Sequence, residues 1–526
     1  KSVIVRMSLM MVGLGLIGLL CSVTAQYFAA KAAVGSTTRL RRALFAHLQT
    51  LSYTELDTIG ASTMLTRLTS DMNQVQSGVN LTLRLALRSP FVVFGAMVMA
   101  FTIDVHAAAV FAIVIPILFA VVFGVMIVCI PLYRKVQARL DRVLGMTREN
   151  LTGVRVLRAF GREEEQKREF SARNDALTKE QNHVGRISVL LNPVTYVIIN
   201  LAIVALICTG ALRVESGALS QGDVIALYNY MSQILVELIK LANLVLNITR
   251  AAACCNRIGA VLEIESSQHS PQTEPETTAD APAIEFRRAG LRYAGAGGDA
   301  LDGISFRAEK GQTIGVIGGT GSGKTTLINL IPRFYDATEG SVLVDGVPVE
   351  QYPLESLRRR IGVVPQKAVL FHGTIRENLL WGDPDAGDGT LREALRAAQA
   401  EEIVQGKEGG LDFEIEQGGR NLSGGQRQRL TIARALVRRP EILILDDSAS
   451  ALDFATDAAL RKALRALPER PTVVIVSQRT SSIRHADQII VLDNGHMVGL
   501  GTHEELLRTC EVYREIHESQ YKKEER

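Results

Sequence analysis

The stretch GGTGSGKTT, residues 318–326, decides the fold of the second half of the chain. It follows an apolar run at residues 313–317 and fits the phosphate-binding pattern Gly-x4-Gly-Lys-Thr. Its glycines let backbone N–H groups approach a β-phosphate, and a helix that begins near Lys324 adds its positive N-terminus. Lys324 would reach the β- and γ-phosphates, and the Thr325 hydroxyl would ligate Mg²⁺. The motif alone leaves one alternative, a glycine-rich turn without a ligand.

A second apolar run, EILIL at residues 441–445, ends in the pair Asp446-Asp447. A carboxylate at the end of such a strand should hold Mg²⁺ through water, and a helix N-cap is the alternative role for Asp446. Further runs at residues 472–477 and 488–492 alternate with helical patterns, and Asp493-Asn494-Gly495 predicts a hairpin turn into residues 496–499. This alternation is typical of an α/β sheet that binds its ligand at the C-terminal ends of the strands.

With LSGGQ at residues 422–426 added, the chain resembles the nucleotide-binding domain of an ABC transporter over residues 284–515. The resemblance implies that Tyr293 stacks on adenine and that Gln366, in VVPQ, touches Mg²⁺ and senses the membrane domain. LSGGQ matches the family signature, and SALD at residues 450–453 matches its inter-subunit loop. ATP and Mg²⁺ are therefore the expected ligands.

The predicted site residues form four groups. Nucleotide contacts are expected from Tyr293, Gly318, Gly319, Thr320, Gly321, Ser322, Gly323, Lys324, Thr325, Thr326 and Gln366, and Mg²⁺ contacts from Thr325, Gln366 and Asp446. Signature contacts to ATP on a partner subunit are expected from Ser423, Gly424, Gly425 and Gln426, and inter-subunit contacts from Ser450 and Asp453.

Two positions in the hydrolytic half of the site depart from the family pattern. Hydrolytic members carry Glu where this chain has Asp447, and a carboxylate displaced by about 1 Å can cost about 10²-fold in rate. The family's switch histidine is replaced by Gln478, in VIVSQRT, whose amide cannot exchange a proton near neutral pH. Loss of acid–base assistance typically costs about 10²–10⁴-fold. The pair predicts tight nucleotide occupancy with slow turnover.

The signature, in contrast, is intact at Ser423, Gly424 and Gly425. In ABC dimers each nucleotide lies between the phosphate loop of one subunit and the signature of the other. We therefore expect a heterodimer, in which this chain lends its signature to a partner half-transporter that carries the catalytic Glu and His. A homodimer with two slow sites is the alternative.

Composition restricts the class of protein. The chain has 526 residues, of which 47% are hydrophobic and 21% charged, an unusual balance for a soluble protein. Its net charge of +3 is too small to suggest nucleic acid as a partner. Six scattered cysteines offer no metal-ligand pattern and are expected to pack as small apolar residues.

The first half contains five apolar stretches of membrane-spanning length, about 20 residues each. They cover residues 7–30, 79–103, 105–133, 187–212 and 224–248. The connections at residues 32–79 and 134–186 are rich in Lys and Arg, which places them and the nucleotide-binding domain in the cytosol. We expect a multi-pass protein of a bacterial cell membrane, with membrane lipid as a partner. Similar transporters carry six spanning helices per half, so the first is expected to be missing.

The predicted fold class is an α-helical transmembrane domain followed by an α/β P-loop nucleotide-binding domain. The expected domains are a transmembrane domain at residues 1–265, an exposed Pro- and Thr-rich linker at 266–283 and the nucleotide-binding domain at 284–526. Residues 38–51 and 132–182 favour helices that continue beyond the membrane. By resemblance to ABC exporters, short transverse helices near residues 56–64 and 160–165 would dock on the nucleotide-binding domains.

The expected activity is ATP-driven export of drug-like or lipid-like molecules, hydrophobic or amphiphilic, with most hydrolysis at the site shared with the partner. Uptake by a transporter of exporter-like fold and a nucleotide-gated regulatory subunit are the alternatives. Glu237 and Lys240 lie three residues apart within a spanning segment. They would line a substrate cavity or form a local ion pair.

Overall fold

The computed structural model describes residues 2–86, 88–278 and 280–521. These residues form two compact units. Unit 1 comprises the chain up to His47 and Ser62–Glu263, and unit 2 comprises Leu48–Ala61 and the chain from Ile264 onward. This division falls two residues before the predicted border of the linker, and it places the segment Leu48–Ala61 with the second unit.

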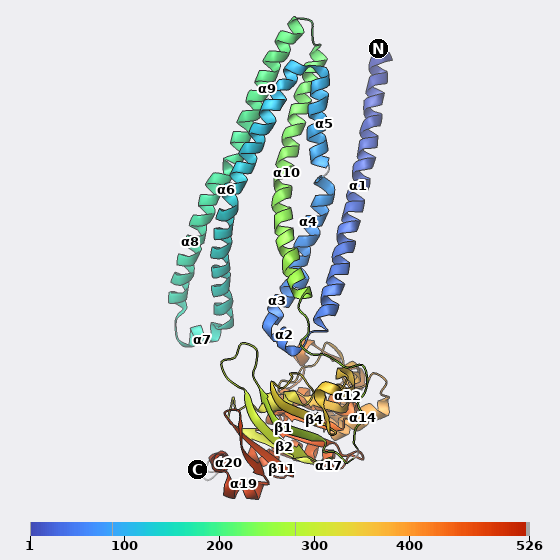
Figure 1. Cartoon of the computed structure of the whole chain (residues 1–526), viewed down its shortest axis with the longest axis vertical. Coiled ribbons are helices and arrows are strands. Elements are labelled where there is room, and N and C mark those ends of the chain that lie inside the picture. The colour runs from blue at the N-terminus through green and yellow to red at the C-terminus, as the bar shows by residue number, and fades with distance from the viewer. Residues whose placement is uncertain (1, 87, 279, 522–526) are drawn as a thin grey trace. The chain divides into compact units, whose positions relative to one another are not determined.

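The described residues of unit 1 form helices joined by short turns. Its elements are α1 (Ser2–Leu48), α3 (Ala61–Thr66), a π-helical turn (Arg67–Asp71), α4 (Met72–Leu85), α5 (Arg88–Ile103), α6 (Val105–Thr152), α7 (Val154–Ala159), α8 (Glu163–Val189), α9 (Leu191–Glu215) and α10 (Gln221–Leu262). Within the described residues, five helical stretches are long and apolar enough to cross a membrane, as predicted. The predicted extensions beyond the membrane are also helical, and Figure 1 shows two of them, α6 and α8, side by side.

One short helix lies elsewhere than predicted. The prediction placed it near residues 160–165, but the structure has α7 at Val154–Ala159. Gly153 ends α6, and Gly161 takes a positive φ of 62° that ends the short helix in a turn. The three glutamates that follow, from Glu163 onward, form the first turn of α8, because acidic side chains favour a helix N-terminus. The other predicted short helix, near residues 56–64, corresponds to α2 (Tyr53–Ile59) and α3.

Small residues let the helices of unit 1 approach closely. A Cβ atom on Gly78 of α4 would lie 2.2 Å from the Cβ atom of Ala251 on α10, so only glycine permits this crossing. The core of the unit lies between α5, α6, α9 and α10, where Phe111, Leu206 and Leu227 are fully buried. Most side chains of α1 are exposed and apolar, as expected of a surface that faces lipid.

Unit 2 is built on three sheets. A six-stranded sheet has the order β12-β11-β3-β10-β9-β6, a four-stranded antiparallel sheet has the order β2-β1-β4-β5, and β7 pairs with β8. The strands are β1 (Ile284–Leu291), β2 (Leu301–Ala308), β3 (Thr313–Gly318), β4 (Glu339–Val344), β5 (Val347–Pro348), β6 (Ile361–Val364), β7 (Gly373–Thr374), β8 (Glu414–Ile415), β9 (Ile442–Asp446), β10 (Thr472–Val476), β11 (Gln488–Asp493) and β12 (His496–Gly501).

The α-helices of unit 2 are α2, α11 (Lys324–Leu330), α12 (Leu354–Arg360), α13 (Ile375–Leu380), α14 (Asp388–Ala397), α15 (Glu401–Gln405), α16 (Gly424–Val437), α17 (Phe454–Arg465), α18 (Thr480–Ile483), α19 (His503–Thr509) and α20 (Glu511–Tyr521). Short 3-10 turns occupy Val349–Gln351, Gly410–Asp412, Gln417–Gly419 and Ser448–Ala451.

The six-stranded sheet is buried on both faces, which explains why its strands have continuous apolar sequences. Along β9, Ile442 and Ile444 pack in one core while Leu443 and Leu445 pack in the other. The α/β sheet and the hairpin β11–β12 were predicted, and both are confirmed; the structure shows that β3, β9, β10 and β11 pair in parallel. At the hairpin, Asn494 and Gly495 have φ values of 47° and 83°, as a two-residue turn between twisted strands requires.

The described residues of the segment 266–283 contain no helix or strand. The segment nevertheless packs against the rest of unit 2. The Gln268 side chain is buried and donates to the carbonyl of Arg333 at 3.2 Å, and Glu274 pairs with Arg360 at 3.1 Å. The prediction of an exposed linker is therefore wrong at Gln268 and at Ala283, which are both buried.

Candidate functional site

Four neighbouring parallel strands bring the predicted site residues to one edge of the sheet. In the order β3-β10-β9-β6, Val476 of β10 is in register with Val316 of β3 and with Asp446 of β9. Four groups of predicted site residues therefore lie at or just after the C-terminal ends of these strands. The phosphate loop follows β3, Gln478 follows β10, the aspartate pair lies at the end of β9, and Gln366 follows β6. Ligands of open α/β sheets bind at such an edge.

The phosphate loop joins β3 to α11, which begins at Lys324 as predicted. Gly318 must be glycine, because a Cβ atom there would lie 2.1 Å from the carbonyl oxygen of Leu492. Gly323 has a φ of 97°, and a Cβ atom on it would lie 2.8 Å from the carbonyl oxygen of Ala300. The glycines therefore let the loop curve tightly against its neighbours and leave its N–H groups open to a phosphate.

The Lys324 ammonium lies over this loop. Its Nζ donates to the carbonyl of Gly318 at 2.9 Å and to the hydroxyl of Ser322 at 3.3 Å. Burial lowers the pKa of Lys324, against the raising effect of the nearby Asp447 and Asp446 carboxylates. A phosphate anion in the loop would favour the charged ammonium in the same way.

The residues predicted to hold Mg²⁺ supply the oxygen atoms that this ion prefers. The Thr325 hydroxyl donates at 3.2 Å to the carboxylate of Asp446, the last residue of β9. Asp446 is buried, and burial raises its pKa, with a further contribution from the charge of Asp447. A divalent cation here would relieve this repulsion, so the donor set fits Mg²⁺.

Asp447 has a backbone conformation that few residues adopt. Its φ is 44°, in the left-handed region that Asp and Asn tolerate better than most residues. Its N–H donates to the carbonyl of Val476 at 3.0 Å, and its carboxylate lies 3.5 Å from the Gln366 side-chain nitrogen. Burial raises the pKa of Asp447, against the lowering effect of the positive charge of Arg479.

Gln478 follows β10 in an exposed loop. Its carbonyl oxygen accepts a hydrogen bond of 2.7 Å from the side chain of Gln520, near the end of the C-terminal helix α20. Arg479 comes next and lies 5.5 Å from the ring centre of Phe454, at the start of α17. The switch loop, residues 477–479, is therefore supported by two distant elements.

A cavity of about 490 Å³ extends from the phosphate loop. It is lined by Tyr293, Asp299, Ala300, Gly321, Gly323, Lys324, Thr325, Thr326, Asn494 and Gly495. The Tyr293 hydroxyl donates to that of Thr326 at 3.1 Å, which fixes the aromatic ring beside the loop. The structure thus joins the predicted adenine-stacking residue and the predicted phosphate-binding residues in one cavity.

The signature caps the helix α16. Ser423 is the N-cap and accepts from the N–H of Gln426 at 3.3 Å, while the Gln426 side chain accepts from the N–H of Ser423 at 3.0 Å. Gly424 and Gly425 form the first turn, whose N–H groups suit an anion. The reciprocal cap occupies the Gln426 side chain and leaves Ser423, Gly424 and Gly425 as the residues open to a phosphate.

The segment predicted to contact a second subunit, residues 450–453, is hydrogen-bonded to Asp447. The Ser450 hydroxyl donates to the carbonyl of Asp447 at 2.7 Å, and Asp453 caps α17 by accepting from the N–H of Thr456 at 2.8 Å. A displacement of this loop would therefore reach the backbone of Asp447 directly.

Glu237 lies on α10 of unit 1 and is fully buried. One carboxylate oxygen accepts from Lys240 and the other from Ser89 of α5, each at 2.8 Å. This is the geometry of the local ion pair. Because Glu237 has no exposed surface, a substrate could reach its carboxylate only if one of the neighbouring side chains moved.

Sequence reasoning missed residues that support the site from a distance. The Tyr335 hydroxyl donates to Asp57 of α2 at 2.6 Å, and its ring meets that of Tyr293 edge-on at 5.1 Å. Gln520 likewise holds the switch loop. Asp57 and Tyr335 are 278 positions apart, and such pairs carry no local sequence signal. Only the apolar face of the C-terminal helix, with Tyr513 and Ile516, could have indicated that this helix packs on the domain.

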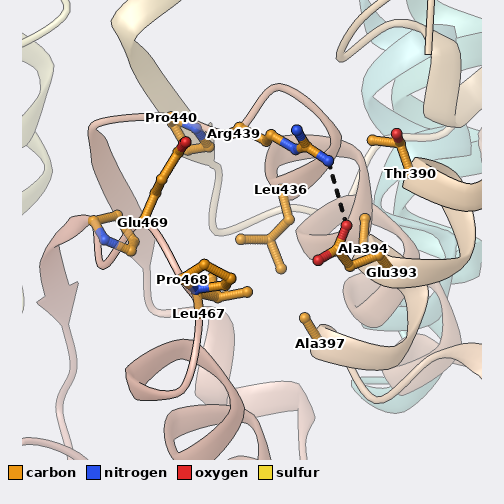
Figure 2. Close-up of a pocket in the computed structure, with 11 residues that line it drawn as sticks. Thr390, Glu393, Ala394, Ala397, Leu436, Arg439, Pro440, Leu467, Pro468 and Glu469 are labelled. Carbon is orange, nitrogen blue, oxygen red and sulfur yellow. Dashed lines mark hydrogen bonds and ion pairs between the residues drawn. The ribbon is translucent and has the colours of Figure 1, made fainter.

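A second pocket in unit 2 lies outside the nucleotide motifs. Figure 2 shows its wall, in which Leu436, Leu467 and Pro468 face one another below an ion pair between Arg439 and Glu393 of 3.4 Å. Its volume is about 180 Å³. None of the predicted nucleotide-binding residues lines this pocket, so it is not part of the site described above.

Comparison with known proteins places both halves of the chain in one family. Residues 2–238 match the ABC transporter transmembrane region, and residues 301–450 match the ABC transporter domain. An uncharacterized ABC transporter ATP-binding protein of Mycobacterium tuberculosis is 39% identical over 522 residues, which cover 98% of this chain and 89% of the relative.

Two further bacterial relatives have functional names. A probable multidrug resistance ABC transporter ATP-binding/permease protein of Bacillus subtilis is 34% identical and spans 91% of this chain and 82% of its own length. An ATP-dependent lipid A-core flippase of Hahella chejuensis is 31% identical and spans 94% of this chain and 84% of its own length.

A solved structure shows the same fold. The structure of a bacterial Atm1-family ABC exporter with ATP bound superposes with a TM-score of 0.80 at 24% identity, over 93% of this chain and 87% of the other. The predicted fold class and the prediction of a multi-pass membrane protein are both confirmed. The chain belongs to the ABC transporter family, as a half-transporter of exporter fold that joins a transmembrane region and an ATP-binding region in one polypeptide.

Proposed function

We propose that the chain is one half of a heterodimeric ABC exporter. Its own nucleotide site, formed by the phosphate loop and the aspartate pair, would hold ATP and hydrolyse it slowly. Its intact signature would complete the hydrolytic site of the partner half-transporter. The observation that carries this proposal is the contrast at one sheet edge between a complete phosphate loop and the residues Asp447 and Gln478.

The binding part of this proposal rests on the contacts of the phosphate loop. Lys324 and the N–H groups of the loop would bind the phosphates, and Tyr293 would stack on the base. Thr325, Asp446 and Gln366 would hold Mg²⁺, which would neutralise charge on the phosphates.

The slow turnover rests on two side chains. Asp447 carries its carboxylate one methylene closer to a strained backbone than Glu would, so it reaches less far toward an attacking water. The Gln478 amide would hydrogen-bond the γ-phosphate but cannot take up a proton from the water. Both changes favour retention of ATP over its hydrolysis.

The second chain follows from the signature. Ser423 and the first turn of α16 offer N–H groups and a hydroxyl that no residue of their own subunit requires for nucleotide binding. A partner with Glu and His at the two altered positions would use these groups to complete a fast site.

The transported class is proposed from the relatives and from composition. One relative is named a lipid A-core flippase and another a probable multidrug resistance transporter, so we propose drug-like or lipid-like amphiphiles as cargo. Binding of ATP would close the nucleotide-binding domains, and the long helices of unit 1 would carry this motion to the membrane.

The test compares matched variants in the assembled pair, reconstituted in lipid vesicles with a partner half-transporter that carries Glu and His at the two altered positions. Asp447→Ala should lower ATP turnover and vesicle transport less than about threefold, because this site contributes little hydrolysis. Replacement of the partner's catalytic Glu by Ala should lower both by about 10²-fold or more. Asp385→Ala, in an exposed loop, is the control. Equal losses from the two carboxylates would reject the asymmetry.

A further inference from the structure

The C-terminal helix α20 ends on the switch loop that carries Gln478. The side chain of Gln520 makes three hydrogen bonds there. Its Nε2 donates to the carbonyl of Gln478 at 2.7 Å, and its Oε1 accepts from the N–H of Thr480 at 2.9 Å and from the hydroxyl of Thr480 at 3.0 Å. One amide side chain thus holds the backbone on both sides of Arg479.

The helix that presents Gln520 is firmly anchored. Tyr513 is fully buried, and its hydroxyl lies 2.7 Å from Nδ1 of His503 on α19. Ile516 packs against the same apolar core. Tyr513, Ile516 and Gln520 are spaced three and four residues apart, so they share one face of the helix. The position of Gln520 is therefore set by the core of the domain rather than by the loop that it contacts.

The loop itself has few other supports. It spans three residues between the end of β10 and the start of α18. Ser477 is buried and its hydroxyl accepts from the N–H of Arg479 at 3.0 Å, whereas Gln478 and Arg479 are exposed. The N–H of Ser477 donates to the carbonyl of Val316 on β3 at 3.1 Å, so the start of the loop is fixed to the sheet, and the hydrogen bonds of Gln520 act beyond it, at residues 478 and 480.

We propose that Gln520 is a positioning residue for nucleotide binding: it fixes the switch loop so that the Gln478 amide reaches the γ-phosphate. This inference rests on the proposed function, since it requires ATP in the site of this chain. Gln520 is not among the residues that line the cavity at the phosphate loop, and it would act through the carbonyl of Gln478 and the backbone of Thr480.

The proposal makes a prediction that a purely structural role does not. If Gln520 fixes the loop for contact with the γ-phosphate, its loss weakens the binding of ATP, which has this phosphate. The binding of ADP, which lacks it, stays unchanged. Loss of Gln520 should therefore reduce the preference of the site for ATP over ADP. General destabilisation of the domain would weaken both nucleotides alike.

The experiment measures equilibrium binding of MANT-ATP and MANT-ADP, with Mg²⁺, to the full chain in lipid nanodiscs. Gln520→Ala should weaken MANT-ATP binding about fivefold, the factor that one neutral hydrogen bond typically represents, and leave MANT-ADP binding within about twofold. Gln520→Glu keeps both acceptor contacts to Thr480 but sets a carboxylate against the Gln478 carbonyl, and should reproduce the loss. Ser519→Ala, one residue earlier on an exposed face, is the control.

A double-mutant cycle isolates the path of the effect. In a Gln478→Ala background, Gln520→Ala should change MANT-ATP binding by less than about 1.5-fold, because the amide to be positioned is gone. Equal weakening of ATP and ADP, or an undiminished loss in the Gln478→Ala background, would overturn the proposal. If the unchanged chain bound no MANT-ATP, the proposed function would fail, and this inference with it.

Discussion

The two halves of the nucleotide site differ in how closely they keep the family's chemistry. The binding half, on β3 and α11, has every residue that a phosphate loop needs, and its geometry leaves no room for a side chain at Gly318. The hydrolytic half lies on β9 and β10, which pair in parallel in the same sheet as β3. It carries Asp447 and Gln478 at the two positions that differ from the family pattern. The two halves therefore share one fold, and on the proposed function they differ in side-chain reach and in proton chemistry.

ATP binding and ATP hydrolysis therefore require different groups at one sheet edge. Binding depends on backbone N–H groups and on the Lys324 ammonium, which the fold positions. Hydrolysis requires a carboxylate at the right distance and a group that can exchange a proton. A subunit that lacks the groups for hydrolysis can still bind nucleotide. A transporter with such a subunit stays active if the partner hydrolyses ATP.

The largest expected effect comes from restoring the hydrolytic half. In the assembled pair with the partner's catalytic Glu replaced by Gln, Asp447→Glu combined with Gln478→His should raise residual ATP turnover about 10²-fold, because reach and acid–base assistance both return. Phosphate release at saturating Mg-ATP measures the change. The same two changes combined with Lys324→Ala provide the control and should give no increase. If the variant with Asp447→Glu and Gln478→His alone raised ATP turnover by less than about threefold, these two side chains would not limit the rate of hydrolysis.

A smaller effect is expected from the binding half. Lys324→Ala should weaken MANT-ATP binding by the full chain at least about 30-fold, since removing one partner of a buried charge contact costs about 2–5 kcal/mol. Lys310→Ala is the matched control, because this lysine pairs with Asp345 away from the cavity. If Lys324→Ala and Lys310→Ala bound MANT-ATP equally well, the loop would not hold phosphate.

Much of this site was predictable because its signals are local. The spacing from Gly318 to Thr325 prescribes the loop, and the apolar run before Asp446 prescribes a strand buried on both faces. The hairpin at Asn494 was predicted for the same reason, since two consecutive residues must take positive φ. In each case, residues that are close together in the sequence determine both the element and where it ends.

The supports of the site were not predictable, because each joins residues that are remote in sequence. Gln520 meets Gln478 across 42 positions, and Tyr335 meets Asp57 across 278. Glutamine near the end of a helix and tyrosine after another helix have no distinctive spacing. The segment near residues 160–165 was misplaced for a different reason, because the acidic run from Glu163 begins the next helix rather than belonging to the short one.

The smallest expected effect tests a support of the binding half. The Tyr335 hydroxyl donates to Asp57 of α2, and the Tyr335 ring packs on Tyr293 beside the cavity. Tyr335→Phe removes the hydrogen bond and keeps the ring, so α2 should open more readily by about the factor of five that one hydrogen bond represents. Hydrogen exchange of the amides of Tyr53–Ile59 measures this opening.

The control for this change lies on the same helix. Thr58→Val removes a hydroxyl that bonds only within α2, to the carbonyl of Thr54, and should leave the contact with Tyr335 unchanged. If Asp57→Asn were combined with Tyr335→Phe, the exchange rate should rise no further than with Tyr335→Phe alone, because both changes act on one bond. Unchanged exchange in Tyr335→Phe would show that the ring contacts of Tyr53 with Phe334 and Tyr335, at 4.8 and 6.0 Å, hold α2 without it. The binding half would then depend on α2 through aromatic packing, whereas the hydrolytic half depends on α20 through hydrogen bonds to its backbone.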